Sequence, residues 1–358
     1  MPSLKEIKGR INSISSTLAI TSAMKMVASA KLQKAQMAIQ NMLPYERRLY
    51  SMLVDLMGAM NISAAASEDG SVRGSGSAER GFDQSGDRLS LSNRHDLAGM
   101  DGAYSLMAQR EVRKVAIVAF ASNSSLCGAF NSNVIREATA VINEYRASGL
   151  GDADITVYSV GRKMAEAMKK LGFPSPADFT KMSDSPSYDA ASALAQELFD
   201  GFVSGRFDKV ELVYNHYKST SSQPTTRQTY LPLSLADATA DLQAGKITDS
   251  ASETDTNRGA EPVGAPVVRQ GSPTTEDLIV EPSKEELIAT LLPKVVRLRI
   301  FTTLLDSAAA EHAARTVAMQ LATDNGNDLL QELTLEYNKG RQQKITSEIL
   351  DLVGGSMQ

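Results

Sequence analysis

Apolar residues recur at helical spacing in two long segments, one at each end of the chain. The first segment runs from Ser3 to about Gly58, and Ser3 with Glu6 forms a capping-box pattern at its start. No proline interrupts this segment before Pro44. Its apolar residues follow the alternating three-and-four spacing of a coiled-coil seam at Leu4, Ile7, Ile11, Ile14 and Leu18, and Met24 and Val27 are expected to continue it.

The second segment begins with another capping box, from Ser283 to Glu286, and keeps helical character to Leu352. Gly354 and Gly355 are expected to end it, and Pro293 is the one residue that threatens a kink. Its apolar stripe consists of Leu287, Leu291, Val295, Leu298, Phe301, Leu305 and Ala308, and is expected to resume at Ile345, Ile349 and Leu352.

Helices of these lengths cannot be contained in a compact domain. At 1.5 Å per residue they would extend roughly 80 Å and roughly 100 Å, against about 30 Å for a small domain. A protruding helix must bury its apolar stripe on a partner, because isolated helices are only marginally stable. The sequence therefore predicts an antiparallel two-stranded coiled coil formed by the two ends of the chain.

Between the helices, strand and helix patterns alternate. Strands are predicted at Lys114–Ala121, Ile155–Val160 and Val210–Tyr214, with Arg227–Leu233 as a possible edge strand. Helices are predicted between them at Asn131–Ala147, Arg162–Leu171 and Tyr188–Ser204. This alternation is typical of an α/β fold, here a small Rossmann-like domain with a mostly parallel sheet.

Two segments rich in Ser, Gly, Asp, Pro and Thr interrupt this order and are interpreted as mobile surface inserts. A short helical turn is expected at Leu235–Leu242, before the second insert becomes irregular. The expected organisation is an N-terminal helix over 1–60, an insert over 63–109, a central domain over 110–236, a second insert over 237–280 and a C-terminal helix over 281–358.

Composition favours a helical, soluble or peripheral protein. The 358 residues include no Trp, 5% aromatics and one cysteine, Cys127, which excludes an internal disulfide and favours a reducing compartment. The first residues enter the capped helix directly, so no signal peptide is expected, and no apolar run is long enough to cross a bilayer. The net charge is only −5, but the first helix up to Leu43 is basic, with Glu6 against Lys5, Lys8, Arg10, Lys25, Lys31 and Lys34. Such a helix is either a solvated face or a surface for acidic partners.

A search for chemistry gives no catalytic set. The segment Ser124–Asn131 follows a strand and starts a helix, where α/β folds bind phosphates, but it lacks both the GxGxxG and the P-loop pattern. Gly128 is expected to allow a tight turn there. Cys127 and the histidines His95, His216 and His312 have no spacing typical of a catalytic triad or a metal site. No cofactor or metal is expected.

Four stretches of the chain, in order, resemble the γ subunit of the F-type ATP synthase in its bacterial form, here with two inserts. They are ITSAMKMVASAKL from Ile20, LCGAFNSN from Leu126, EHAARTVAMQLATDN from Glu311 and ELTLEYNKGRQQKITSEILDLVGG from Glu332. Together with both helices and the central domain, the resemblance covers nearly everything except the inserts.

This resemblance implies a central-stalk rotor that is not itself an enzyme. In the family, the paired helices rise through a ring of three α and three β subunits, and the central domain and foot rest on the c ring. Proton flow turns the c ring, and the asymmetric shaft drives the β sites through ATP synthesis. The implied partners are the α3β3 head, ε and the c ring, at the cytoplasmic side of the bacterial inner membrane.

The resemblance also implies contact residues. Met24 falls at the methionine near the acidic lever loop of β, and the residues expected to touch the head besides it are Arg315, Arg341, Gln342, Thr346 and Glu348. The residues expected at the foot, near ε and the c ring, are Tyr214, Asn215, His216 and Tyr217. The sequence departs from the family pattern at Ser125 and at Gly340, and Gly340 is expected to weaken the helix near its tip.

Two other interpretations stay open at this point. One is an unrelated coiled-coil adaptor with an α/β head, which would be stable without an α3β3 head. The other is a nucleotide-dependent enzyme with helical arms, which would bind nucleotide as an isolated chain.

Overall fold

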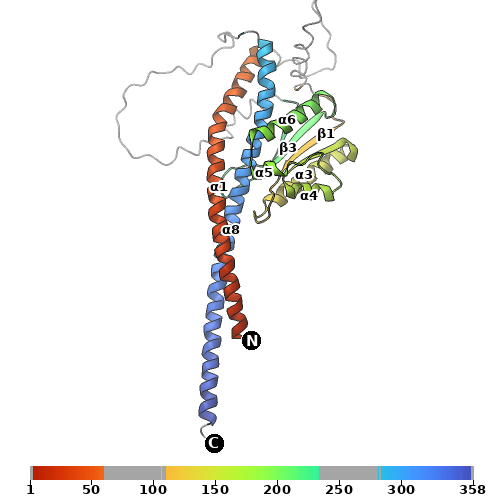
Figure 1. Ribbon diagram of the computed structural model, residues 1–358. Coiled ribbons are helices and arrows are strands. Elements are labelled where there is room, and N and C mark those ends of the chain that lie inside the picture. Colours follow the sequence, from red (N-terminus) through yellow and green to blue (C-terminus); the bar gives the residue numbers. More distant parts are fainter. Residues whose placement is uncertain (1–2, 60–105, 107–109, 234–280, 282–283, 356–358) are drawn as a thin grey trace, which may run out of the picture.

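The computed structural model describes residues 3–59, 106, 110–233, 281 and 284–355. Helix α1 (Leu4–Ala59) and helix α8 (Lys284–Gly355) run antiparallel along one another, and the α/β domain sits on one side of their upper half (Figure 1). Both proline residues, Pro44 and Pro293, stay inside their helices. The predicted coiled coil of the chain's own ends is confirmed.

The start of α1 forms half of the predicted capping box. The Glu6 backbone N–H donates to the Ser3 hydroxyl at 3.2 Å, as expected of an N-cap serine. The Glu6 carboxylate instead pairs with Arg10, one turn further along, at 3.1 Å. Ser283, the cap predicted for α8, lies outside the described residues.

The two helices keep one register over the lower part of the coil. Thr21 and Thr323 join their hydroxyls at 3.0 Å, Leu18 packs on Gly326, and Leu4 packs on Gly340. From one pair to the next, the residue number rises on α1 by the same amount as it falls on α8, so the antiparallel register does not shift.

The predicted continuation of the seam through Met24 and Val27 is wrong. Both side chains are exposed, Met24 at 40% and Val27 at 57%, whereas Ala28 and Leu32 are buried. Strict three-and-four spacing after Leu18 passes through Thr21, Lys25 and Ala28, so small and polar side chains continue the seam and the larger apolar ones are left outside.

The predicted return of the seam at Ile345, Ile349 and Leu352 is also wrong. These side chains are exposed at 46%, 54% and 74%, because α1 begins at Leu4, opposite Gly340, and the last turns of α8 have no α1 beside them. We call this part of α8, residues 341–355, the tip. Gly340 does not interrupt the helix, and a Cβ there would lie 3.1 Å from Leu4 Cδ2.

The central sheet has the order β2-β1-β3-β4. Strands β1 (Val115–Phe120), β2 (Ile155–Val160) and β3 (Lys209–Asn215) are parallel, and β4 (Thr225–Leu231) pairs antiparallel with β3 at the edge. This confirms the mostly parallel α/β domain and its edge strand.

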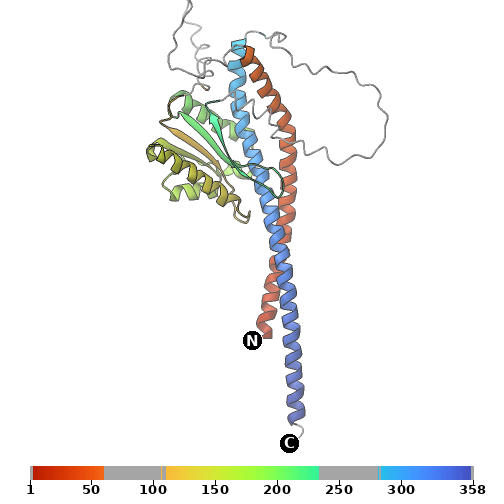
Figure 2. The ribbon, with the colours of Figure 1, turned by 180° about the vertical axis from the view of Figure 1, so that it is seen from behind.

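The central strand β1 is buried on both faces, because alternate side chains enter two different cores. Ala116, Val118 and Phe120 pack toward α6 (Tyr188–Val203) and α8, whereas Val115 and Ile117 pack toward α3 (Phe130–Ala147) and α4 (Arg162–Lys170). The view from behind shows α3 and α4 on the outer side of the sheet (Figure 2).

Two short elements were not predicted, the 3₁₀ turn η3 (Asp152–Asp154) and helix α5 (Thr180–Asp184). Each is too short to give a periodic pattern. The two predicted inserts fall almost wholly outside the described residues, as does the turn expected at Leu235–Leu242.

Candidate contact surfaces of the shaft

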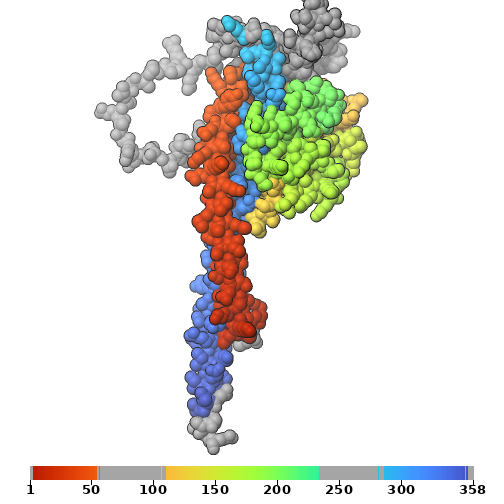
Figure 3. All heavy atoms as spheres, viewed as in Figure 1, coloured from red at the N-terminus to blue at the C-terminus, as the bar shows by residue number. Residues whose placement is uncertain are grey.

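Below the central domain, the paired helices α1 and α8 stand clear of the rest of the chain, and we call this part the shaft (Figure 3). From Leu4 to Leu32, α1 extends roughly 40 Å along it. Apolar side chains remain on its outer surface, with at least half of each exposed on α1 at Ile20, Met26 and Val27, and on α8 at Leu321, Leu329 and Leu335. A surface of this kind is typical of a helix that contacts another protein.

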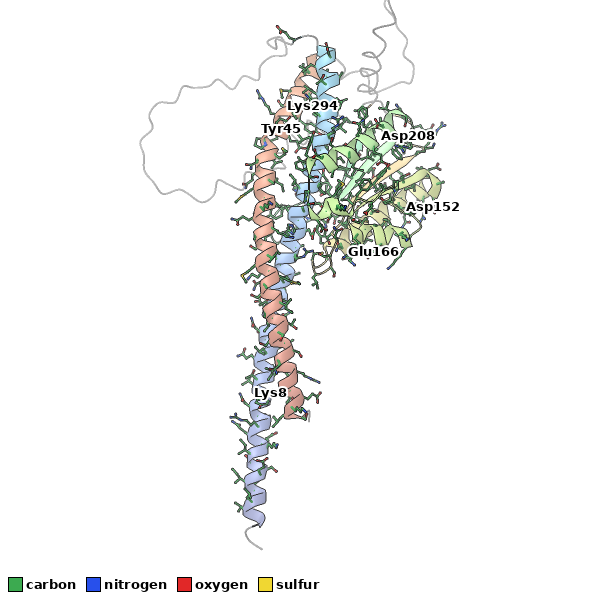
Figure 4. The ribbon with its side chains drawn as sticks, viewed as in Figure 1. Lys8, Tyr45, Asp152, Glu166, Asp208 and Lys294 are labelled. Atoms are coloured by element: carbon green, nitrogen blue, oxygen red, sulfur yellow. The ribbon has the colours of Figure 1, made fainter. Side chains whose placement is uncertain are left out.

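Met24 lies on this surface, between basic side chains. Lys31 and Lys34 are exposed on the same helix, and Lys25 is half-buried beside the seam. Lys8 marks the free end of this basic stretch in Figure 4. Because Glu6, the one carboxylate there, is paired with Arg10, the stretch presents a positive surface to whatever surrounds the shaft.

The tip carries the four other residues predicted from the C-terminal motif. Arg341, Gln342, Thr346 and Glu348 are all exposed, and the Thr346 hydroxyl donates to the Gln342 carbonyl at 2.9 Å. Glu348 forms an exposed ion pair with Lys344 at 3.8 Å, a type that contributes little to stability. The tip thus combines these polar side chains with exposed apolar ones on a single helix.

Arg315 lies higher on α8, where the shaft meets the domain, and its side chain is only 17% exposed. It donates at 2.7 Å both to Glu311 and to the Ser124 hydroxyl of the loop after β1. Burial raises the pKa of Glu311, as does the charge of Asp184, and Arg315 and Lys31 oppose that rise. In this structure Arg315 therefore helps to hold the domain on α8.

The residues predicted at the foot also lie where the domain meets the helices. Asn215 is 1% exposed; its amide donates to the Phe130 carbonyl at 3.1 Å and accepts from the Thr225 hydroxyl at 2.7 Å. Tyr214 is buried as well. A direct contact of these two with ε or a c ring is therefore not supported, whereas for His216 and Tyr217, which are less buried, it stays a prediction.

The loop at Ser124–Asn131 is built as a docking element of the domain. Cys127 is buried and accepts a weak hydrogen bond from the Asn131 amide at 3.2 Å. Gly128 has φ +58°, a conformation that side chains rarely adopt, so glycine permits the turn, while the loop lies against α8 at Ala318. The predicted tight turn is confirmed.

Small-molecule sites are usually clefts or cavities of roughly 300–1,000 Å³ in which a few polar groups orient the ligand. Here, the groove between this loop and α8 is lined mainly by small and apolar side chains, including Phe130, Ala314 and Leu321. The charged groups that cradle phosphates are not among its lining residues.

Among the described residues, no group of three or more His, Cys, Asp or Glu side chains is arranged to hold a metal ion. His312 lies on α8, and burial, with smaller effects of Arg315 and Lys31, lowers its pKa to about 4. His95 lies outside the described residues. Within the described part of the chain, no helix combines the length and apolarity needed to span a bilayer.

Sequence reasoning missed the residues that join the domain to the helices below its core. Asp306 on α8 accepts from the Tyr217 backbone N–H at 2.9 Å, and Gln36 on α1 donates to the Tyr217 hydroxyl at 2.6 Å. One signal was available: Asp306 interrupts a run of apolar and small residues from Leu304 to Ala310. An acid in such a run usually has a specific partner.

Comparison with known proteins places this architecture in one family. The family model for ATP synthase matches residues 3–357. The ATP synthase γ chain of Phocaeicola vulgatus is 47% identical over 357 residues, covering 100% of both chains, and that of Bacteroides thetaiotaomicron is 46% identical over 358 residues with the same coverage.

A solved structure has the same overall fold. It is that of the Euglena gracilis mitochondrial ATP synthase, with OSCP, F1 and c-ring in rotational state 3, in which the matched chain has a TM-score of 0.52 and 19% identity. The match covers 99% of this chain and 93% of that chain. The chain therefore belongs to the γ-chain family of ATP synthase.

Proposed function

We propose that this γ chain works as a purely mechanical part, with no catalytic residues of its own. The chain is the central-stalk rotor subunit of ATP synthase, and it transmits rotation of the c ring to the α3β3 head. The observation that supports a mechanical role best is the coiled coil, in which both ends of the chain form one shaft that extends beyond the domain.

Coupling requires that the shaft make different contacts with the three β subunits at each angle. A partner changes conformational state only to the extent that contact free energies differ between states. The shaft is asymmetric in the necessary way, because α1 carries a basic surface and α8 extends alone as the tip. Each β site then meets a different surface as the shaft turns.

We assign the head contacts to Met24 and the tip residues Arg341, Gln342, Thr346 and Glu348, whose exposure supports this role. Arg315 is a weaker candidate, since it is bound to Glu311 and Ser124. His216 and Tyr217 remain candidates for a contact with ε or the c ring. The domain division 1–60, 63–109, 110–236, 237–280 and 281–358 is proposed on the same basis.

The location follows from the assembly. As a peripheral part of the membrane-bound complex, the chain reaches the membrane through its partners, and the bacterial relatives support a position at the cytoplasmic side of the inner membrane.

Replacing Met24 with Lys tests the proposed contact on the shaft. The new positive charge adds to those of Lys25 and Lys31, next to the acidic loop expected on the β subunit. ATP-driven proton pumping should therefore fall more than ATP hydrolysis does. Both rates are measured in inverted membrane vesicles that contain the assembled complex. Lys169→Ala, on the exposed end of α4, serves as the control and should change neither rate.

Two results count against the proposal in different ways. Equal losses of pumping and hydrolysis in Met24→Lys would contradict the contact at Met24. Failure of the wild-type chain to purify with α and β subunits would contradict the rotor function itself.

A further inference from the structure

The loop after β3 binds both helices above the point where the shaft leaves the domain, since Arg315 and Ala318, nearer the tip of α8, still contact the domain. Asp306 of α8 accepts two hydrogen bonds from it, one from the Tyr217 backbone N–H at 2.9 Å and one from His216 Nδ1 at 2.6 Å. The hydroxyl of Tyr217 accepts a third, from Gln36 Nε2 of α1, at 2.6 Å. We call these four residues the clamp.

The side chain of Tyr217 also packs on two small apolar clusters. One, from both helices, includes Leu32 and Ala309. The other consists of Cys127 and Phe130 of the domain and Ala310 of α8. One side chain therefore contacts α1, α8 and the loop after β1, so the clamp joins three separate parts of the chain.

The clamp lies well away from the upper end of the helix pair, where α1 ends and α8 begins. Helix α1 continues to Ala59 and α8 begins at Lys284, both beyond the domain core and away from the tip (Figure 1). Nearer the tip, Arg315 of α8 bonds to Ser124 and Ala318 lies against Gly128, whereas the clamp bonds the domain to both α1 and α8.

The charge of Asp306 makes the clamp stronger than it would be from apolar packing alone. Its side chain is 17% exposed, and hydrogen bonds to an ionised, largely covered carboxylate are stronger than those between neutral groups. The remaining bond to α1, between Gln36 and Tyr217, is neutral. Asp306 is thus the residue whose loss would release the loop from α8.

We propose that Asp306 is a positioning residue that fixes the central domain to both helices just above the shaft, so that torque entering the domain passes through the clamp to the paired helices. This inference rests on the proposed rotor function and adds a route for the torque. It gives His216 and Tyr217 a role within the chain that does not depend on a contact with ε or the c ring.

The test uses the assembled ATP synthase in inverted membrane vesicles, with three variants of this chain. Asp306→Ala removes both acceptors. Asp306→Asn keeps an oxygen that can accept the Tyr217 N–H. Tyr217→Phe keeps the ring and removes the hydroxyl, with its bond from Gln36 and its 3.5 Å contact with the Thr220 hydroxyl. The control is Asp189→Ala, which removes an exposed aspartate from the first turn of α6.

Two quantities are measured for each variant. The first is hydrogen exchange of the Tyr217 amide, which should accelerate about tenfold in Asp306→Ala because one hydrogen bond to a charged group is lost. The second is the ratio of protons pumped to ATP hydrolysed per assembled complex, which should fall in Asp306→Ala, fall less in Tyr217→Phe, and recover in Asp306→Asn. The control should match the wild type in both.

A purely structural role would reduce the amount of assembled complex without changing the ratio per complex. The proposal is therefore overturned if Asp306→Ala complexes pump with the wild-type ratio, or if the Tyr217 amide exchanges at the wild-type rate. If Asp306→Ala fails to assemble, a wild-type ratio in Tyr217→Phe overturns it. Failure of the proposed rotor function would instead be seen in the wild-type chain.

Discussion

At the scale of single residues, the domain depends on one buried charge. Glu211 on β3 is 1% exposed, and it accepts hydrogen bonds from Arg227 at 2.6 Å and Tyr145 at 2.6 Å and pairs with Lys209 at 2.7 Å. Burial alone would raise its pKa, but the hydrogen bonds from Arg227, Lys209 and Tyr145 outweigh burial and hold the pKa below its ordinary value of 4.5. The group therefore stabilises the fold only in its ionised form.

Replacing Arg227 with Ala should destabilise the chain by about 3–5 kcal/mol, because it leaves a buried carboxylate without its main partner. Since the wild-type pKa is lower in the folded state than in the unfolded chain, the stabilisation is present above about pH 4.5 and is lost as pH falls through the folded-state value. The variant should therefore also unfold at a higher pH than the wild type. Denaturant titrations of the purified chain over a range of acidic pH measure both effects.

Arg136→Ala is the matched control, since this exposed arginine of α3 donates to Asn133 on its own helix and should change stability by no more than about 0.5 kcal/mol. A similar small change in both variants would show that Glu211 is not held by Arg227.

At the scale of elements, two glycines in the paired helices have opposite surroundings. A Cβ on Gly326 of α8 would lie 2.7 Å from Leu18 Cδ2 and 3.1 Å from Leu18 Cγ, whereas a Cβ on Gly9 of α1 would have nothing within 4 Å. Gly326 therefore lets the helices approach closely, and Gly9 only weakens α1.

The same substitution at both positions separates helix propensity from packing. Gly9→Ala should raise the free energy of unfolding by about 1 kcal/mol, the usual propensity difference. Gly326→Ala should give no such gain, because overpacking against Leu18 costs about 1–3 kcal/mol. Far-UV circular dichroism during denaturation measures both. An equal gain at the two positions would mean that the helices are not in close contact at Gly326.

At the scale of the whole molecule, the sequence predicts what depends on local pattern. The two long helices, the strands and the edge strand each carry their own periodicity, and all were located within a few residues. After Leu18 apolarity misleads, because the large apolar side chains of Met24 and Val27 lie outside the strict spacing through Thr21, Lys25 and Ala28 that forms the seam.

Two further features could not be read from local pattern. The free tip depends on where α1 begins relative to α8, which is set by the register of distant segments. The clamp joins Tyr217 to Asp306, 89 positions away, and to Gln36, 181 positions away, so no short motif contains it. The contact residues of the shaft came from family resemblance, since exposure alone does not select them.

The central claim is that this chain turns as one rigid shaft inside the α3β3 head. The direct measurement is single-molecule rotation of the complex with the head immobilised and a probe attached through Glu166→Cys, on the outer side of the domain (Figure 4). The buried Cys127 should not compete for the label. With ATP present, the account predicts that the probe turns steadily in one direction. A probe that stays still while the same complexes hydrolyse ATP would contradict it.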